Sequence, residues 1–135
     1  MIVVRRDRES RIELEVVIDE PLGRYIAVSH VWSDGRGNPR DNSLLHCQMN
    51  WLFDVCQLDQ GTPIWMDTLC IPADPDKKDR IYRPAAIQKL NEIYEHADKT
   101  IVISNDLSLR PVRQGVDFWL DVRMSQWARR CWTLQ

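Results

Sequence analysis

Hydrophobic and polar positions follow two patterns along this chain, a strand pattern and the spacing of a helix. Residues 11–19 alternate apolar with acidic side chains, which predicts a half-exposed strand at the edge of a sheet. Residues 25–32 (YIAVSHVW) and 63–71 (PIWMDTLCI) are almost continuously apolar, as is typical of strands covered on both faces. Residues 99–104 (KTIVIS) predict another short buried strand.

Helical spacing appears in the segments between these strands. Residues 45–56 form one predicted helix, with Asn42 or Ser43 placed to cap it, and residues 86–97 form another. Residues 116–132 are less periodic and are predicted to be helical at their start. The apolar stripes are Leu45, Met49, Leu52 and Cys56 in the first helix, and Ala86, Leu90, Ile93 and Ala97 in the second.

Strands that alternate with helices predict an α/β fold with right-handed crossovers and a mainly parallel sheet, plus an extra N-terminal edge strand. Ligands of such sheets bind in the crevice beyond the carboxyl ends of the strands. Asp67 would be costly in a buried strand, so we expect it near the rim of this crevice. The residues predicted at these ends are Ser29, His30 and Trp32, then Asp67 and Cys70, then Ser104, Asn105 and Asp106.

Composition narrows the class of protein. The chain has 135 residues, 44% hydrophobic and 28% charged, which indicates a globular domain. A net charge of -2 and a pI of about 5.9 argue against an electrostatic grip on nucleic acid or on an anionic membrane. The start of the chain lacks the apolar region of a signal peptide, and no apolar run reaches transmembrane length. The four cysteines have no zinc-finger spacing, so we expect no metal, and reduced, mostly buried thiols in a cytoplasmic protein.

Several local patterns carry two interpretations. The loop at residues 34–38 (DGRGN) could cradle a phosphate, but it lacks the GK[ST] ending, and an ordinary turn is the alternative. His30 and Cys70 could form a nucleophilic Cys–His pair, or Cys70 could simply pack in the core. We assign Trp51 and Trp119 to core packing.

Three separated segments each combine tryptophan with a few polar residues, namely residues 25–32, 65–71 (WMDTLCI) and 125–135 (SQWARRCWTLQ). With these motifs, and with the Ile93, Tyr94 and Ala97 pattern between them, the chain resembles the heterokaryon-incompatibility (HET) domain family, best known from fungi. The resemblance covers about residues 25 to 135, four motifs in the family's order.

The chain departs from the family pattern in three places. The family often has Gln-x-Asp where this chain has Pro72, Ala73 and Asp74, and a glutamine and a methionine where Ile87 and Leu90 stand. The chain also stops at Gln135, one residue before a family glutamate, so we expect a fragment cut inside a motif. The expected organisation is an N-terminal strand and turn at residues 1–24, followed by a truncated HET domain at residues 25–135.

The resemblance implies a flavodoxin-like, TIR-like three-layer sandwich. It implies an effector module in nonself recognition that ends in programmed cell death, with self-association and other regions of a longer parent protein as partners. One alternative is a TIR-like NAD glycohydrolase, for which NAD would be the substrate and this chain would be inactive; another is a non-catalytic interaction module. The candidate crevice residues are Ser29, His30, Asp67, Cys70 and Arg130, with Trp32, Trp127 and Trp132 as candidate ligand-binding residues. Arg130 could hold the Asp67 charge through a bidentate pair.

Overall fold

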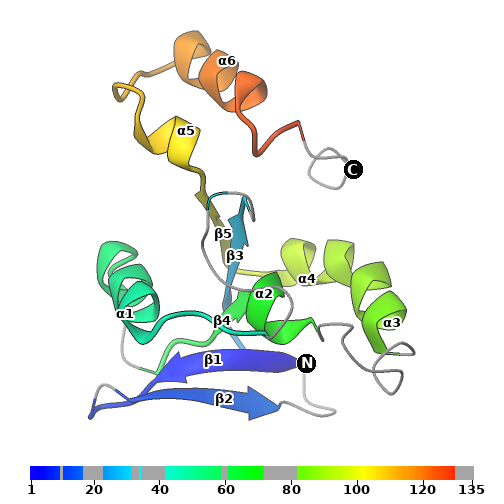
Figure 1. Cartoon of the computed structure of the whole chain (residues 1–135). Coiled ribbons are helices and arrows are strands. Elements are labelled where there is room, and N and C mark those ends of the chain that lie inside the picture. The colour runs from blue at the N-terminus through cyan, green and yellow to red at the C-terminus, as the bar shows by residue number, and fades with distance from the viewer. Residues whose placement is uncertain are drawn as a thin grey trace.

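The computed structural model describes residues 1–9, 11–16, 23–31, 34, 42–58, 61–71 and 82–129 (Figure 1). Within these ranges the chain begins with three strands and continues with helices before, between and after the remaining two. The strands are β1 (Ile2–Arg6), β2 (Ile12–Val16), β3 (Ile26–His30), β4 (Ile64–Met66) and β5 (Lys99–Ile103). The helices are α1 (His46–Val55), α2 (Asp67–Cys70), α3 (Tyr82–Gln88), α4 (Leu90–His96), α5 (Asn105–Ser108) and α6 (Val116–Met124).

The described strands form one open, mixed sheet in the order β2-β1-β4-β3-β5. Strand β3 pairs in parallel with both β4 and β5, whereas β1 pairs antiparallel with β4 and with β2. The α/β class is therefore confirmed, and the predicted N-terminal edge strand is β2. The pattern of the chain did not predict β1, because its short apolar run passes directly into two arginines.

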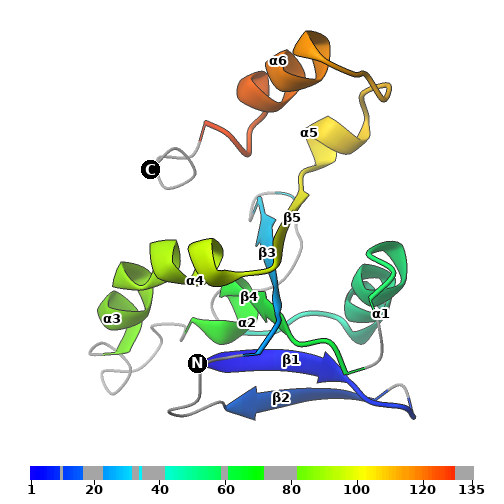
Figure 2. The same ribbon diagram turned by 180° about the vertical axis from the view of Figure 1, so that it is seen from behind.

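The core is divided between the two faces of this sheet, because side chains on a strand alternate between faces. On one face, Val28 of β3 packs with Met49, Leu52 and Phe53 of α1. On the other face, Ala27 packs beneath α3 and α4. Figure 2, which shows the molecule from behind, places α1 and the α3–α4 pair on opposite sides of the sheet.

Helices α3 and α4 use the apolar stripe that helical spacing predicts. All four residues of the stripe in 86–97 are half-buried against the core cluster that contains Tyr25 and Trp65. The Tyr25 hydroxyl donates a hydrogen bond of 2.5 Å to the Ile93 carbonyl, and Trp65 meets Tyr94 edge-on at 5.5 Å between ring centroids. The predicted single helix is instead two, with Lys89 between them.

The predicted strand over residues 63–71 is wrong in its second half. Strand β4 ends at Met66, and α2 begins at Asp67. The Asp67 carboxylate accepts the backbone N–H of Thr68 at 2.8 Å, and its carbonyl accepts the N–H of Ile71 at 2.9 Å. Aspartate favours such local hydrogen bonds over a strand ladder, so it turns the chain out of the sheet.

The predicted cap of α1 is also wrong. The helix begins at His46 after Leu45, whose backbone N–H donates to the Gln48 side chain at 3.3 Å. Asn42 lies farther back and donates its side-chain amide to the carbonyls of Thr68 and Ile71. This residue therefore anchors the end of α2 instead of starting α1.

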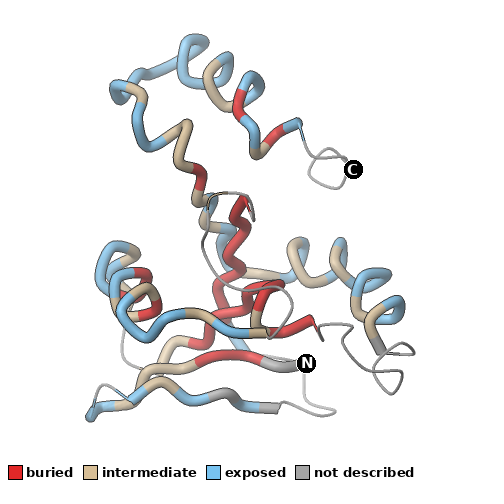
Figure 3. Tube along the Cα trace, in the orientation of Figure 1, coloured by how far each residue is buried: buried red, intermediate tan, exposed pale blue. Residues whose placement is uncertain are grey.

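Three burial predictions are wrong, because β5 lies at the edge of the described sheet and the other side chains lie on the outer faces of α1 and α6. Strand β5 is the outermost strand on its side and is only half-buried on one face. Trp51 and Trp119 are 41% and 69% exposed instead of packed in the core. Cys47 is exposed, although Cys70 is buried as expected. Figure 3 shows the difference in burial between these elements and the core, with buried positions along β3 and β4 and mostly exposed ones along α6.

Candidate functional site

The carboxyl ends of the three parallel strands meet at one edge of the sheet (Figure 1). Their spatial order is β4-β3-β5, so the crossover from β3 leads to one side and the crossover into β5 leads to the other. In open α/β sheets such a reversal of strand order is where ligands bind, so this edge is the candidate site. His30 closes β3, Asp67 follows β4 and Ser104 follows β5.

His30, Asp67 and Thr68 form a buried cluster at this edge. Val28 is paired with Met66 across the parallel strands, so continuing that register brings Ser29 and His30 beside Asp67 and Thr68. His30 Nε2 lies 3.1 Å from Asp67 Oδ1 and 2.7 Å from Thr68 Oγ1. His30 is 0% exposed, Thr68 2% and Asp67 9%.

The donors and acceptors of the cluster define its chemistry. An ionised carboxylate only accepts hydrogen bonds, so the contact with Asp67 requires the proton on His30 Nε2. Because Nε2 carries this proton, the Thr68 hydroxyl oxygen accepts in its contact with His30. Asp67 Oδ1 also accepts the Thr68 backbone N–H. Histidine and backbone donors thus hold a carboxylate that would otherwise be costly to bury.

Cys70 belongs to a different environment, although it is only three residues from Asp67. Its thiol accepts the Met66 backbone N–H at 3.5 Å and packs in the apolar cluster beneath α3 and α4. Burial, reinforced by the nearby Asp67 charge, raises the pKa of Cys70 to about 12. The thiolate is the nucleophilic form, so this environment argues against a Cys–His nucleophilic pair.

Ser29 is held by a residue far along the chain. The Trp127 indole N–H donates to Ser29 Oγ at 2.8 Å, across 98 positions of sequence. Ser29 is buried and Trp127 is half-buried. In this structure Trp127, a predicted ligand-binding residue, therefore fastens the segment after α6 to the end of β3.

A second polar contact fastens the same segment to the end of β5. Asp106 accepts the Gln126 backbone N–H at 2.8 Å with one oxygen and the Ser104 hydroxyl with the other. Partial burial opposes ionisation, but the hydrogen bonds from Ser104 and Gln126, with the charge of Arg110, hold the pKa of Asp106 below 3.8. The Asp106 and Trp127–Ser29 contacts together hold the segment after α6 against the carboxyl edge of the sheet.

The remaining predicted site residues are only partly described. Arg130, Trp32 and Trp132 lie outside the described residues, so the Arg130–Asp67 pair stays a prediction. Of the loop at 34–38, only Asp34 is described, and its carboxylate accepts the Asn105 backbone N–H at 2.8 Å. Sequence reasoning missed Thr68 and Asn42. Strand register alone could have indicated Thr68, whereas no local pattern indicates that Asn42 reaches α2.

Two further findings concern metal binding and membrane crossing. Within the described ranges, no three His, Cys, Asp or Glu side chains gather closely enough to hold a metal ion. None of the described helices combines the length and the apolar character needed to cross a bilayer.

Fold and site together define an α/β domain with a polar cluster at the carboxyl edge of its parallel strands. The chain belongs to the heterokaryon incompatibility protein (HET) family, whose model matches residues 25–117. This match takes in β3, β4 and β5 and all three members of the His30–Asp67–Thr68 cluster. Comparison with curated proteins and with solved structures gave no match.

Proposed function

We propose that this chain is an effector module of fungal heterokaryon incompatibility, which acts in the cytoplasm and contributes to programmed cell death after nonself recognition. The family match over residues 25–117 carries the proposal. It is supported by the His30–Asp67–Thr68 cluster, which joins two of the four motifs by which the chain resembles the family. Self-association and other regions of a longer parent protein are the proposed partners.

The burial of the cluster supports a module that acts through contacts. A catalytic group must touch its substrate, but His30 is 0% exposed and Asp67 is 9% exposed. In this conformation the two side chains brace β3 against α2. We therefore infer that His30 and Asp67 preserve the shape of the carboxyl edge of the sheet, and that partners contact this edge.

Controlled expression in a filamentous fungus tests this function. The wild-type chain, produced from an inducible promoter, is expected to cause uptake of a membrane-impermeant dye. Asp67→Asn, which weakens the buried cluster, is expected to reduce this killing. Asp54→Asn is the matched control, because Asp54 pairs with Arg6 on the surface and is 67% exposed. Unchanged viability with wild-type protein, at verified expression, would contradict the proposal.

The location of the cluster favours a second candidate function, TIR-like cleavage of the nicotinamide–ribose bond of NAD. The cluster lies at the sheet edge where α/β domains bind ligands. Bond cleavage develops positive charge on the ribose, which a neighbouring carboxylate would stabilise. The resemblance gives this role to the family glutamate that follows the motif ending at Gln135, not to the buried Asp67. Nicotinamide release from NAD is measured on a variant extended by a glutamate after Gln135, because the chain without this carboxylate is expected to be inactive. Release that replacing the added glutamate with glutamine abolishes would favour the enzyme, and no release from the extended variant would favour the non-catalytic module.

A further inference from the structure

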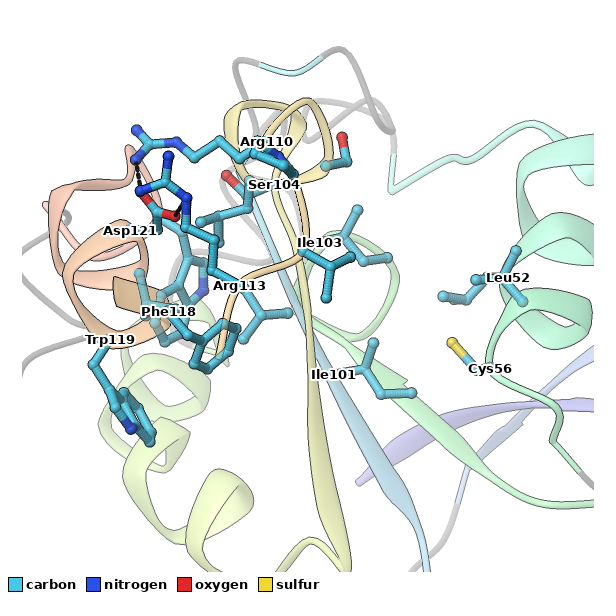
Figure 4. Close-up of a pocket in the computed structure, with 18 of the residues that line it drawn as sticks. Leu52, Cys56, Ile101, Ile103, Ser104, Arg110, Arg113, Phe118, Trp119 and Asp121 are labelled. Carbon is cyan, nitrogen blue, oxygen red and sulfur yellow. Dashed lines mark hydrogen bonds and ion pairs between the residues drawn. The ribbon is translucent and has the colours of Figure 1, made fainter. Parts of the chain in front are cut away.

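An apolar groove of about 750 Å³ lies over β5 (Figure 4), and none of His30, Asp67 and Thr68 lines it. Ile101 and Ile103 form its floor. Leu52 and Cys56 of the α1 region line one side, and Phe118 and Trp119 of α6 line the other. The groove therefore lies between α1 and α6.

The sheet lacks a covering helix at this place among the described elements. Parallel strands are normally covered by helices on both faces. Helix α1 packs against the neighbouring β4 and β3 through its buried residues Met49, Leu52 and Phe53. On the same face, the floor residues of β5 are only half-buried. The missing cover would be an α-helix, which is about 10 Å across with its side chains.

The walls of the groove have the composition of a protein-binding surface. Trp51 is 41% exposed, Phe118 45% and Trp119 69%. Large aromatic residues are costly to leave in water and are enriched in the energetically important parts of interfaces. Three such side chains from α1 and α6 around one hollow favour a protein partner.

The charged residues at the rim of the groove indicate which charge a partner should carry. Arg110 Nη1 lies 2.6 Å from Asp121 Oδ1, and Arg113 Nε lies 3.8 Å from Asp121 Oδ2. Two guanidinium groups thus share one carboxylate, and this part of the rim keeps one net positive charge. Arginine at a rim favours a carboxylate on the partner, through charge-assisted hydrogen bonds and electrostatic complementarity.

We propose that this groove binds an amphipathic α-helix of a partner protein. The apolar stripe of that helix packs on Ile101 and Ile103 between α1 and α6. An aspartate or glutamate on its polar flank meets Arg110 and Arg113. No member of the His30–Asp67–Thr68 cluster lines this groove, although Trp127, which does, donates to Ser29. Variants at Arg113 and Trp119 therefore test the occupancy of the groove without changing the cluster.

Two lactam-bridged helical peptides test the proposal on the full chain. Both carry the same leucine stripe, and their polar flanks carry either glutamate or lysine. Fluorescence anisotropy is expected to show the acidic peptide binding at least about tenfold more tightly than the basic one. Arg113→Glu is expected to reverse that preference, because Arg113 is only loosely paired with Asp121.

Apolar variants locate the binding surface. Trp119→Ser is expected to weaken the acidic peptide at least about tenfold, since an exposed aromatic contact is lost without disturbing the core. Ile87→Ser is the matched control, because Ile87 is 46% exposed on α3, outside the groove. Equal binding of both peptides, or equal weakening by both variants, would overturn the proposal.

Two other occupants would also overturn it. If light scattering shows a dimer, and Trp119→Ser dissociates that dimer while the peptide leaves it intact, the groove binds a second copy of this chain. Binding of the apolar dye anilinonaphthalene sulfonate, lost in Trp119→Ser, with no peptide binding would assign it to a small amphiphile.

Discussion

His30 Nε2 lies 3.1 Å from Asp67 Oδ1, although 37 residues separate the two in sequence. The parallel pairing of β3 with β4 creates this contact, because it aligns the ends of both strands. The His30 ring and the Thr68 backbone N–H both donate hydrogen bonds to the Asp67 carboxylate, which is almost fully buried. The contact therefore joins two separate motifs of the chain into one structural unit.

Asp67→Ala is expected to destabilise the domain by about 2–3 kcal/mol, because His30 and a backbone donor would lose their acceptor in a buried place. Chemical denaturation gives the free energy of unfolding. Asp54→Ala, which removes an exposed ion pair, is expected to cost only about 0–1 kcal/mol. Combining Asp67→Ala with His30→Ala should show a coupling of about 1 kcal/mol. Strict additivity would mean that the two side chains do not support each other.

Trp127→Phe is expected to loosen the segment after α6. The substitution keeps an aromatic ring but removes the indole N–H that donates to Ser29 Oγ. The loss of one partly buried hydrogen bond costs about 1 kcal/mol. Hydrogen exchange should accelerate at residues 125–129 while β3 stays protected. Trp119→Phe, at an exposed position, should leave exchange unchanged; a similar acceleration in both variants would contradict this role of Trp127.

Asp106 makes the docking of this segment sensitive to acid. Its folded pKa lies below 3.8, so its contribution to stability is complete above the unfolded pKa and is lost as the pH falls through the folded value. The wild type should therefore exceed Asp106→Asn in free energy of unfolding by a constant amount above about pH 5. This difference should shrink below pH 3.8. Urea titrations of both proteins across this range provide the measurement, and a difference independent of pH would contradict the role of Asp106.

The cysteines are expected to differ in their reactivity towards iodoacetamide. Cys47 is exposed, whereas Cys70 is buried and its pKa is about 12, so Cys70 stays a protonated thiol at about pH 8. Peptide mass spectrometry after brief alkylation should find Cys47 modified and Cys70 intact until denaturant is added. Equal modification of both in native protein would place Cys70 outside the core.

Periodicity alone was sufficient to predict most of the regular elements. The apolar run in residues 25–32 predicted β3, and the stripe in residues 86–97 predicted the face that α3 and α4 bury. These predictions succeed because a strand repeats every two residues and a helix every 3.6, whatever surrounds them. The carboxyl-edge location of His30 and Asp67 also followed from the α/β order of the elements.

Long-range packing decided the rest. The sequence by itself determined the α/β class, the presence of the buried strand β3 and the motifs that place the chain in its family. Only the tertiary structure decided that His30 faces Asp67 and Thr68 instead of Cys70, and that Trp119 stays exposed beside a groove. Local spacing reports which face of its own element a side chain occupies. Strand register and helix placement decide what lies opposite that face, and they depend on contacts between residues far apart in the chain.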